Sequence, residues 1–136
     1  MKLVNRRTAN QFHDWQRVNL PGKFVIQDID TWVLVISDST DDYRPLALIE
    51  EKRSSIPPET WTPFKDDLPN YMALYQLSLK AELPLWILYF TPEFPESKIA
   101  LFKIKSVNPA SVRWIDYDKH VLTSSEFQRD FKKFFE

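Results

Sequence analysis

Two carboxylates and one amine on neighbouring predicted strands could do chemistry together: Asp30, Glu50 and Lys52. Glu50 and Lys52 follow an apolar run, and positions two apart in a strand point to the same side. Both side chains therefore share one face, while Glu51 faces away. Charged groups at the end of a buried strand cost desolvation unless they are paired or hold a metal. Their presence there needs a chemical reason.

The position of Asp30 follows from the hairpin that the sequence predicts. Residues 37–44 are rich in Ser, Asp and Thr, which indicates a loop. The centre of this loop sets Asp30 opposite Lys52, one same-face step from Glu50. The predicted register allows a slip of two residues, which would put Asp28 in the place of Asp30 as a ligand.

Two converging carboxylates beside a lysine make an oxygen-rich site of the kind that binds Mg²⁺ or Mn²⁺. Such an ion polarises a phosphoryl oxygen and lowers the pKa of a bound water. The lysine can orient that water or neutralise developing charge. The constellation thus predicts phosphodiester hydrolysis. The alternative for the same residues is an ion pair at a sheet edge, which needs neither a metal nor a substrate.

The elements that would position these residues begin with a helix and a hairpin. Thr8 and Gln11 form a predicted capping box, and the helix that follows runs to about Arg17. Residues 23–37 have strand composition and form two strands or one bent strand. Residues 45–49 are apolar without polar alternation, which is typical of a strand covered on both faces.

A second helix is predicted over residues 68–81, capped by Asp66 or Asp67. Its expected apolar stripe consists of Leu68, Met72, Tyr75 and Leu79. Further strands are expected over residues 85–91 and 100–105.

The carboxyl-terminal segment predicts a last helix. Thr123 and Glu126 form a capping box. The apolar face of this helix consists of Phe127, Phe131, Phe134 and Phe135. These rings are expected to be core, with an exposed portion available for a homodimer interface. The order helix, hairpin, helix, strand, strand, helix predicts one α/β domain over residues 1–136, in which helices flank a small mixed central sheet.

Residues 29–34 and 46–52 resemble the signature of the PD-(D/E)XK nuclease-like superfamily, which has the restriction endonuclease-like fold. In that family an acidic residue precedes one strand, and Glu-x-Lys ends the next. The order of elements from Thr8 to Thr91 also resembles the family's core of helix, three strands, helix and strand (α-β-β-β-α-β).

The resemblance implies a role for each matching residue. Asp30 and Glu50 would be metal ligands, the carbonyl of Glu51 a third ligand, and Lys52 the catalytic lysine. Gln76 would join the catalytic residues from the second helix, with a tyrosine nearby, for which Tyr71 and Tyr75 are the candidates. The chain departs from the family pattern in two places. Ile29 replaces the proline that names the motif, and the first helix offers Asp14 or Gln11 in place of the family's frequent glutamate.

Composition narrows the classes of function. Apolar residues are 43% and charged residues 27%, a globular balance. A net charge of -1 argues against nucleic-acid binding by bulk electrostatics, so any such contact must be local. The absence of cysteine excludes disulfides and thiolate zinc sites, and the single glycine, Gly22, excludes Gly-rich phosphate loops. The longest apolar run, residues 83–90, is far shorter than a membrane span, so the expected location is the cytoplasm.

The predicted function is a metal-dependent nuclease, using Mg²⁺ or Mn²⁺, that hydrolyses DNA phosphodiester bonds. The alternative is a catalytically silent domain of the same fold that binds nucleic acid or a protein partner. Single-stranded, double-stranded and branched substrates, and internal or terminal cutting, are all compatible with the pattern.

Overall fold

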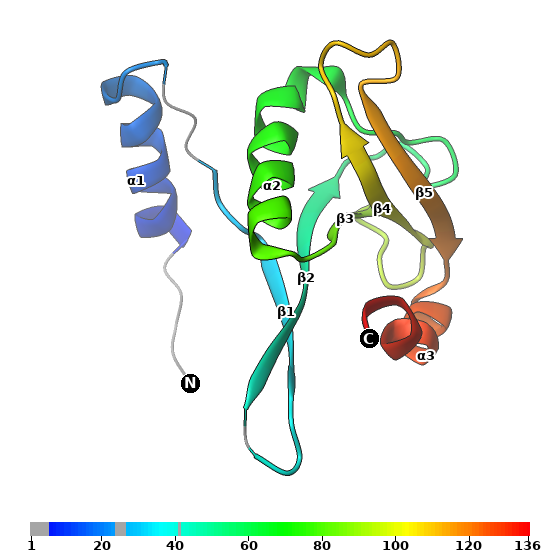
Figure 1. The fold of residues 1–136 in the computed structure, drawn as a ribbon. Coiled ribbons are helices and arrows are strands. Elements are labelled where there is room, and N and C mark those ends of the chain that lie inside the picture. Colours follow the sequence, from blue (N-terminus) through cyan, green and yellow to red (C-terminus); the bar gives the residue numbers. More distant parts are fainter. Residues whose placement is uncertain (1–5, 24–26, 41) are drawn as a thin grey trace.

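The computed structural model describes residues 6–23, 27–40 and 42–136, with the backbone alone for residues 6–10 and 13 (Figure 1). Its elements follow in the order α1 (Arg6–Asn19), β1 (Thr31–Ile36), β2 (Tyr43–Arg53), α2 (Leu68–Ala81), β3 (Leu85–Phe90), β4 (Ile99–Val107), β5 (Ile115–Leu122) and α3 (Ser124–Phe135). A short 3-10 helix, Lys65–Asp67, immediately precedes α2. In these parts of the chain no helix has both the length and the apolar character needed to cross a membrane.

The five strands of the described residues form one open mixed sheet in the order β1-β2-β3-β4-β5. β2 and β3 run parallel, whereas the other neighbouring pairs are antiparallel. Parallel neighbours need a crossover connection, and α2 lies in this one. The predicted α/β class, with a mixed central sheet flanked by helices, is confirmed.

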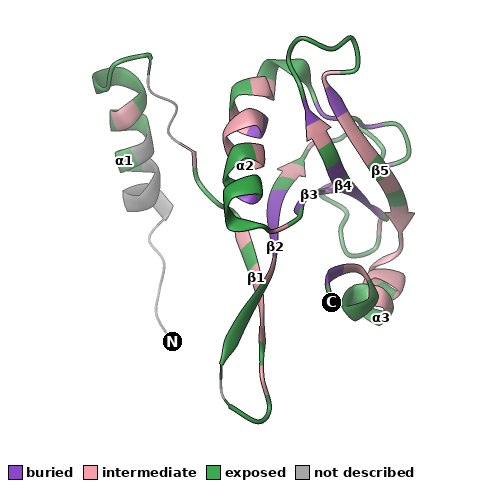
Figure 2. Ribbon diagram, in the orientation of Figure 1, coloured by how far each residue is buried: buried purple, intermediate pink, exposed green. Residues whose placement is uncertain are grey.

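The side chains of β2 alternate between two core clusters. On one face Leu48 belongs to the cluster that includes Tyr71 of α2. On the other face Ala47 and Ile49 cluster with Phe135 of α3. Figure 2 shows that burial concentrates in the central strands and along one side of α2, while the far end of the β1–β2 hairpin is exposed. The central apolar residues of β2 are therefore covered on both faces, as predicted.

The strand β5 is absent from the predicted order, although its burial alternates at the start. Ile115 is buried, and Tyr117 packs against the same core cluster. Lys119 then occupies a position where an alternating strand would carry an apolar side chain. Its ammonium donates to the carbonyl oxygens of Glu59 and Trp61, at 3.1 and 3.0 Å. These hydrogen bonds hold the loop that contains Glu59 and Trp61 against the sheet. Because a charged residue interrupts the apolar alternation, the sequence did not predict this strand.

The helix α1 differs from its prediction at the start. It already includes residues 6–7, so Thr8 lies inside the helix and the predicted capping box of Thr8 with Gln11 is wrong. Arginine is a good helix former, which explains why the helix includes these residues. Phe12 and Trp15 stack on each other at a centroid distance of 6.2 Å, and both are exposed. Neither ring is part of a core cluster.

The predicted strand from residue 23 is not found where the structure describes the chain. Residues 24–26 lie outside the described residues, and residues 27–30 have no regular secondary structure. The described part of the chain has two strands before α2, where the resemblance implies three.

The helix α2 spans residues 68–81, as predicted. Three predicted stripe residues pack against the core: Leu68, Met72 and Tyr75. The fourth, Leu79, is exposed, and the fully buried positions are instead Tyr71, Leu74 and Ser78. The Ser78 hydroxyl donates to the carbonyl of Tyr75 at 2.7 Å, which satisfies a polar group at a buried position. The stripe was misassigned because a serine lies on the inner face.

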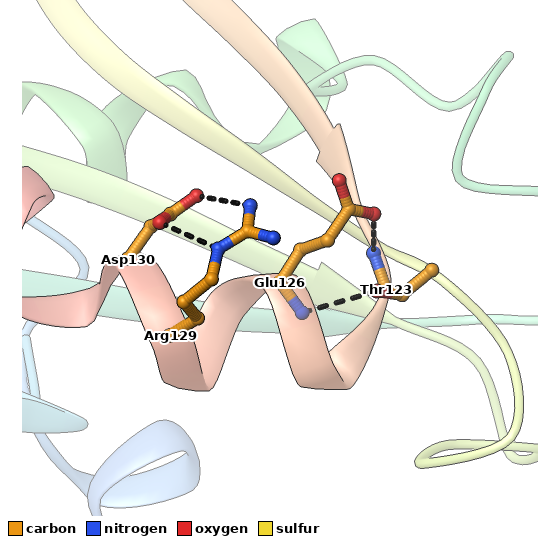
Figure 3. Close-up of polar contacts among 4 residues, drawn as sticks. All are labelled: Thr123, Glu126, Arg129 and Asp130. Atoms are coloured by element: carbon orange, nitrogen blue, oxygen red, sulfur yellow. Dashed lines mark hydrogen bonds and ion pairs between the residues drawn. The ribbon is translucent and has the colours of Figure 1, made fainter.

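The capping box of α3 is confirmed (Figure 3). The Thr123 hydroxyl accepts from the amide of Glu126 at 3.1 Å, and the Glu126 carboxylate accepts from the amide of Thr123 at 3.0 Å. Arg129 and Asp130 pair at 3.0 and 2.9 Å farther along the helix. This start directs α3 so that Phe135 reaches the core.

Candidate active site

The candidate site lies where the parallel strands β2 and β3 end side by side, with Arg53 paired to Phe90. In open α/β sheets, ligands bind beyond the carboxyl ends of such strands. Glu50 and Lys52 share the α2 face with Leu48, because residues two apart in a strand point the same way. Arg53 belongs to the opposite face.

The hairpin register differs from the predicted one by two residues. Thr31 pairs with Ile49, which puts Asp30 beside Glu50 rather than opposite Lys52. The difference begins at the tip of the hairpin, where Ile36 pairs with Tyr43, three residues away from the partner that the prediction implies. The ladder then shifts register by one residue between Val33 and Leu34, which reduces the difference to two.

The correct register brings the two predicted carboxyl groups into direct contact. The side chains of Asp30 and Glu50 are hydrogen-bonded to each other. Asp30 also accepts a hydrogen bond from the backbone amide of Glu51, at 2.8 Å. That amide holds the Asp30 carboxylate at the end of β2, so the meeting of the two acids is built into the backbone.

The environment of Glu50 favours its neutral form. The residue is only 7% exposed. Burial, followed by the hydrogen bond and the negative charge of Asp30, raises the pKa of Glu50 to about 8, against a smaller opposing effect of Lys52. The Gln27 amide donates to the Glu50 carboxyl at 3.3 Å. Without a cation, Glu50 therefore keeps its proton near neutral pH and can donate it to Asp30.

The ammonium of Lys52 pairs with a different acid. It lies 3.5 Å from the Asp67 carboxylate and 5.4 Å from the ring centroid of Tyr71. Asp67 was one of the two predicted caps of α2, and it does occupy the cap position. Its side chain makes no capping hydrogen bond there. The carboxylate is directed to Lys52 instead, so the helix start contributes to the site.

Tyr71 of α2 lies next to Lys52. Its ring is fully buried, and its hydroxyl has no hydrogen-bond partner among the described residues. Burial, together with the nearby carboxylates of Asp67 and Glu50, raises the pKa of the phenol above its ordinary value. A neutral phenol therefore lies beneath the charged groups.

A cleft of about 340 Å³ opens in front of the acid pair. Its polar and charged lining comes from α1, from the irregular segment 27–30, from β2 and from α2: Gln16, Arg17, Gln27, Asp28, Asp30, Glu50 and Asn70. Asp28, the alternative ligand, thus lines the same cleft. The contribution of α1 comes from Gln16 and Arg17, whereas Gln11 and Asp14 do not line the cleft.

Other predicted site residues are placed elsewhere. Gln76 is exposed on α2 and does not line the cleft. Tyr75 donates its hydroxyl to the carbonyl of Lys105 at 3.3 Å, so Tyr71 is the tyrosine beside the acids. The Glu51 side chain accepts from the Thr31 hydroxyl at 2.9 Å and is exposed. The structure therefore gathers Asp30, Glu50 and Lys52, and leaves Gln76 out.

The donor set fits a divalent ion in part. Within the described ranges, no three His, Asp or Glu side chains gather as a metal site. Asp30 and Glu50 nevertheless supply two converging carboxyl groups. No described lysine or arginine forms an ion pair with either. Once Glu50 has lost its proton, the two carboxylates are a suitable pair of hard ligands for Mg²⁺ or Mn²⁺.

Sequence reasoning missed four polar residues that line the cleft with the acid pair: Gln16, Arg17, Gln27 and Asn70. Each lies on a predicted helix or in a predicted strand segment, which is also the pattern of an ordinary solvated surface, so the sequence holds no signal that separates them. Comparison with known proteins adds no relative: no family model, curated protein or solved structure matches this chain.

Proposed function

We propose that this chain is a metal-dependent nuclease that hydrolyses DNA phosphodiester bonds, with a site of the PD-(D/E)XK type on a restriction endonuclease-like core. The observation that carries the proposal is the direct contact of the Asp30 and Glu50 carboxyl groups at the mouth of a cleft. The order α1-β1-β2-α2-β3, with β2 parallel to β3, supports the core assignment.

The acid pair would hold Mg²⁺ or Mn²⁺, with the carbonyl of Glu51 as a third oxygen. When bound, the ion supplies Lewis-acid activation of the phosphoryl group and of a water. The role of the protein itself is to hold the two carboxylates at a fixed separation. Asp30 is positioned for this by the Glu51 amide, at 2.8 Å. Glu50 must release its proton before it can act as a ligand, so a cation replaces that proton in the site.

Lys52 would assist the attacking water and neutralise charge that develops on the phosphate. It shares the face of Glu50 and is close enough to lower the pKa of that acid. To reach the water, its ammonium must leave Asp67, a partly exposed ion pair of the kind that costs little to break.

The second candidate is a catalytically silent domain of the same fold that binds nucleic acid or a protein. The Lys52–Asp67 ion pair, at 3.5 Å, favours it, because it occupies the amine that catalysis would need. The shared proton of Asp30 and Glu50 favours it as well, since a proton can replace the ion permanently.

Calorimetric titration with Mg²⁺ tests the ion site. We expect wild-type protein and Glu51→Ala to bind the ion, because the substitution keeps the Glu51 carbonyl, and Glu50→Ala to lose binding. Equal binding by all three proteins, or binding by none, would refute the metal site.

Mn²⁺-dependent nicking of plasmid DNA tests catalysis. We expect nicking by the wild type, its loss in Lys52→Ala, and its retention in Lys132→Ala, which removes an exposed lysine of α3. Ion binding without nicking would identify the silent domain instead.

A further inference from the structure

A second hollow adjoins the acid pair. It measures about 170 Å³ and is lined by Asp30, Glu51, Arg53 and Phe90. Glu51 and Arg53 alternate with Glu50 and Lys52 along β2, so this hollow belongs to the opposite face of the sheet. Asp30 lines both hollows, and they therefore meet at this residue.

The second hollow carries an aromatic surface. Phe90 is the last residue of β3 and is only partly buried. It is absent from both core clusters of the described residues. Phe94 lies beside it at a centroid distance of 5.9 Å and is 43% exposed. Two accessible rings next to a charged site form a surface on which a nucleobase can stack.

The two hollows also carry positive charges. Arg53 is exposed in the second hollow, and Arg17 is exposed in the first. Neither takes part in an ion pair with another described residue. Two guanidinium groups on either side of the acid pair are suited to bind phosphates of one strand.

We infer that the site takes single-stranded nucleic acid, which runs from the Arg17 side of the cleft past Asp30 to Arg53, with one base stacked on Phe90. The inference rests on the proposed function, because the position at which the strand is cut is that of the proposed nuclease site. The first hollow, of about 340 Å³, has the size of a small-ligand site, and the second, of about 170 Å³, is a smaller extension of it. Bases inside a duplex are already stacked on one another and do not reach a protein ring.

The test measures binding apart from cleavage. We would use the Asp30→Asn/Glu50→Gln protein without metal, since these substitutions remove the acids that repel phosphate and that hydrolysis would need. Fluorescence anisotropy with a labelled single strand of about 12 nucleotides then reports the Kd. The matched controls are Phe131→Leu, a partly exposed ring of α3, and Arg44→Gln, at the other end of β2.

We expect Phe90→Leu to raise the Kd about tenfold and Phe90→Trp to preserve it, because stacking needs an aromatic face. Arg53→Gln should reduce the slope of log Kd against log salt concentration by about 0.7, the contribution of one phosphate contact on a single strand. Neither control should change the Kd or the slope, and a duplex of the same sequence should bind more weakly.

The inference is overturned if Phe90→Leu binds like Phe131→Leu, or if duplex binds as tightly as the single strand. Cleavage of duplex with no effect of Phe90→Leu would overturn the inference and leave the nuclease function standing. Stacking-dependent binding by a wild-type protein that nicks no DNA would support the inference and refute the nuclease function.

Discussion

The carboxyl groups of Asp30 and Glu50 are hydrogen-bonded to each other, although they come from opposite sides of a long hairpin. Two acids can share a hydrogen bond only if one of them keeps a proton. The pKa of about 8 for Glu50 identifies it as the acid that keeps the proton in the folded protein. Stability, ion binding and pH are therefore linked through this contact.

The first prediction concerns stability and pH. The folded-state pKa of Glu50 is about 8, above its ordinary value of 4.5. Between these two values the folded protein holds a proton that the unfolded chain has lost. The contribution of Glu50 is fully present below a pH of about 4.5 and is lost as the pH rises to about 8.

We expect the free energy of unfolding of metal-free wild type to fall with rising pH by about 1.4 kcal/mol per pH unit more than that of Glu50→Gln. Urea denaturation at a series of pH values measures this difference. Glu51→Gln, whose side chain is exposed, should keep the wild-type slope. A slope that is the same in wild type and Glu50→Gln would contradict the shared proton.

The second prediction concerns ion uptake. Because Glu50 is protonated near neutral pH, Mg²⁺ binding should release about one proton at pH 6–7 and fewer as the pH rises above the pKa of about 8. Titration calorimetry in buffers of different ionisation enthalpy counts the protons. Asp30→Asn should bind the ion more weakly, because one carboxylate ligand is lost. A binding enthalpy that is independent of the buffer would show that the ion does not displace the proton.

The sequence predicted the parts of this protein that depend on local pattern. The bounds of α2, the capping box at Thr123 and the doubly covered strand β2 all follow from local residue patterns or from a continuous apolar run. The meeting of Asp30 with Glu50 was also predicted, because side-chain alternation in a strand fixes which residues share a face.

The errors arose where distant parts of the chain decide the outcome. The hairpin register depends on where the turn closes and on the shift between Val33 and Leu34, and no local pattern marks either. The strand β5 was missed because Lys119 is stabilised by carbonyl oxygens far away in the sequence. Asp67 looked like an ordinary helix cap, and only the packing of α2 on the sheet directs its carboxylate to Lys52.

The third prediction tests the anchoring of α3. Thr123→Ala removes the hydroxyl that accepts from the Glu126 amide at 3.1 Å. We expect the free energy of unfolding to fall by about 1 kcal/mol, as for other caps of this type. The urea midpoint measures the loss. Ser125→Ala, at an exposed position inside the same helix, should leave the midpoint nearly unchanged, and an equal loss in both variants would contradict the capping role.

The fourth prediction separates the two roles that Asp67 could have. Asp67→Asn removes the carboxylate that holds Lys52 at 3.5 Å, and it breaks no capping hydrogen bond of α2. Because the ion pair is partly exposed, stability should change by less than about 1 kcal/mol. If Lys52 must leave Asp67 to assist the attacking water, Mn²⁺-dependent nicking by Asp67→Asn should be a few-fold faster than by wild type. Asp66→Asn, the exposed neighbour in the 3-10 helix, should nick at the wild-type rate. A large loss of nicking in Asp67→Asn alone would show instead that Asp67 positions the lysine for catalysis.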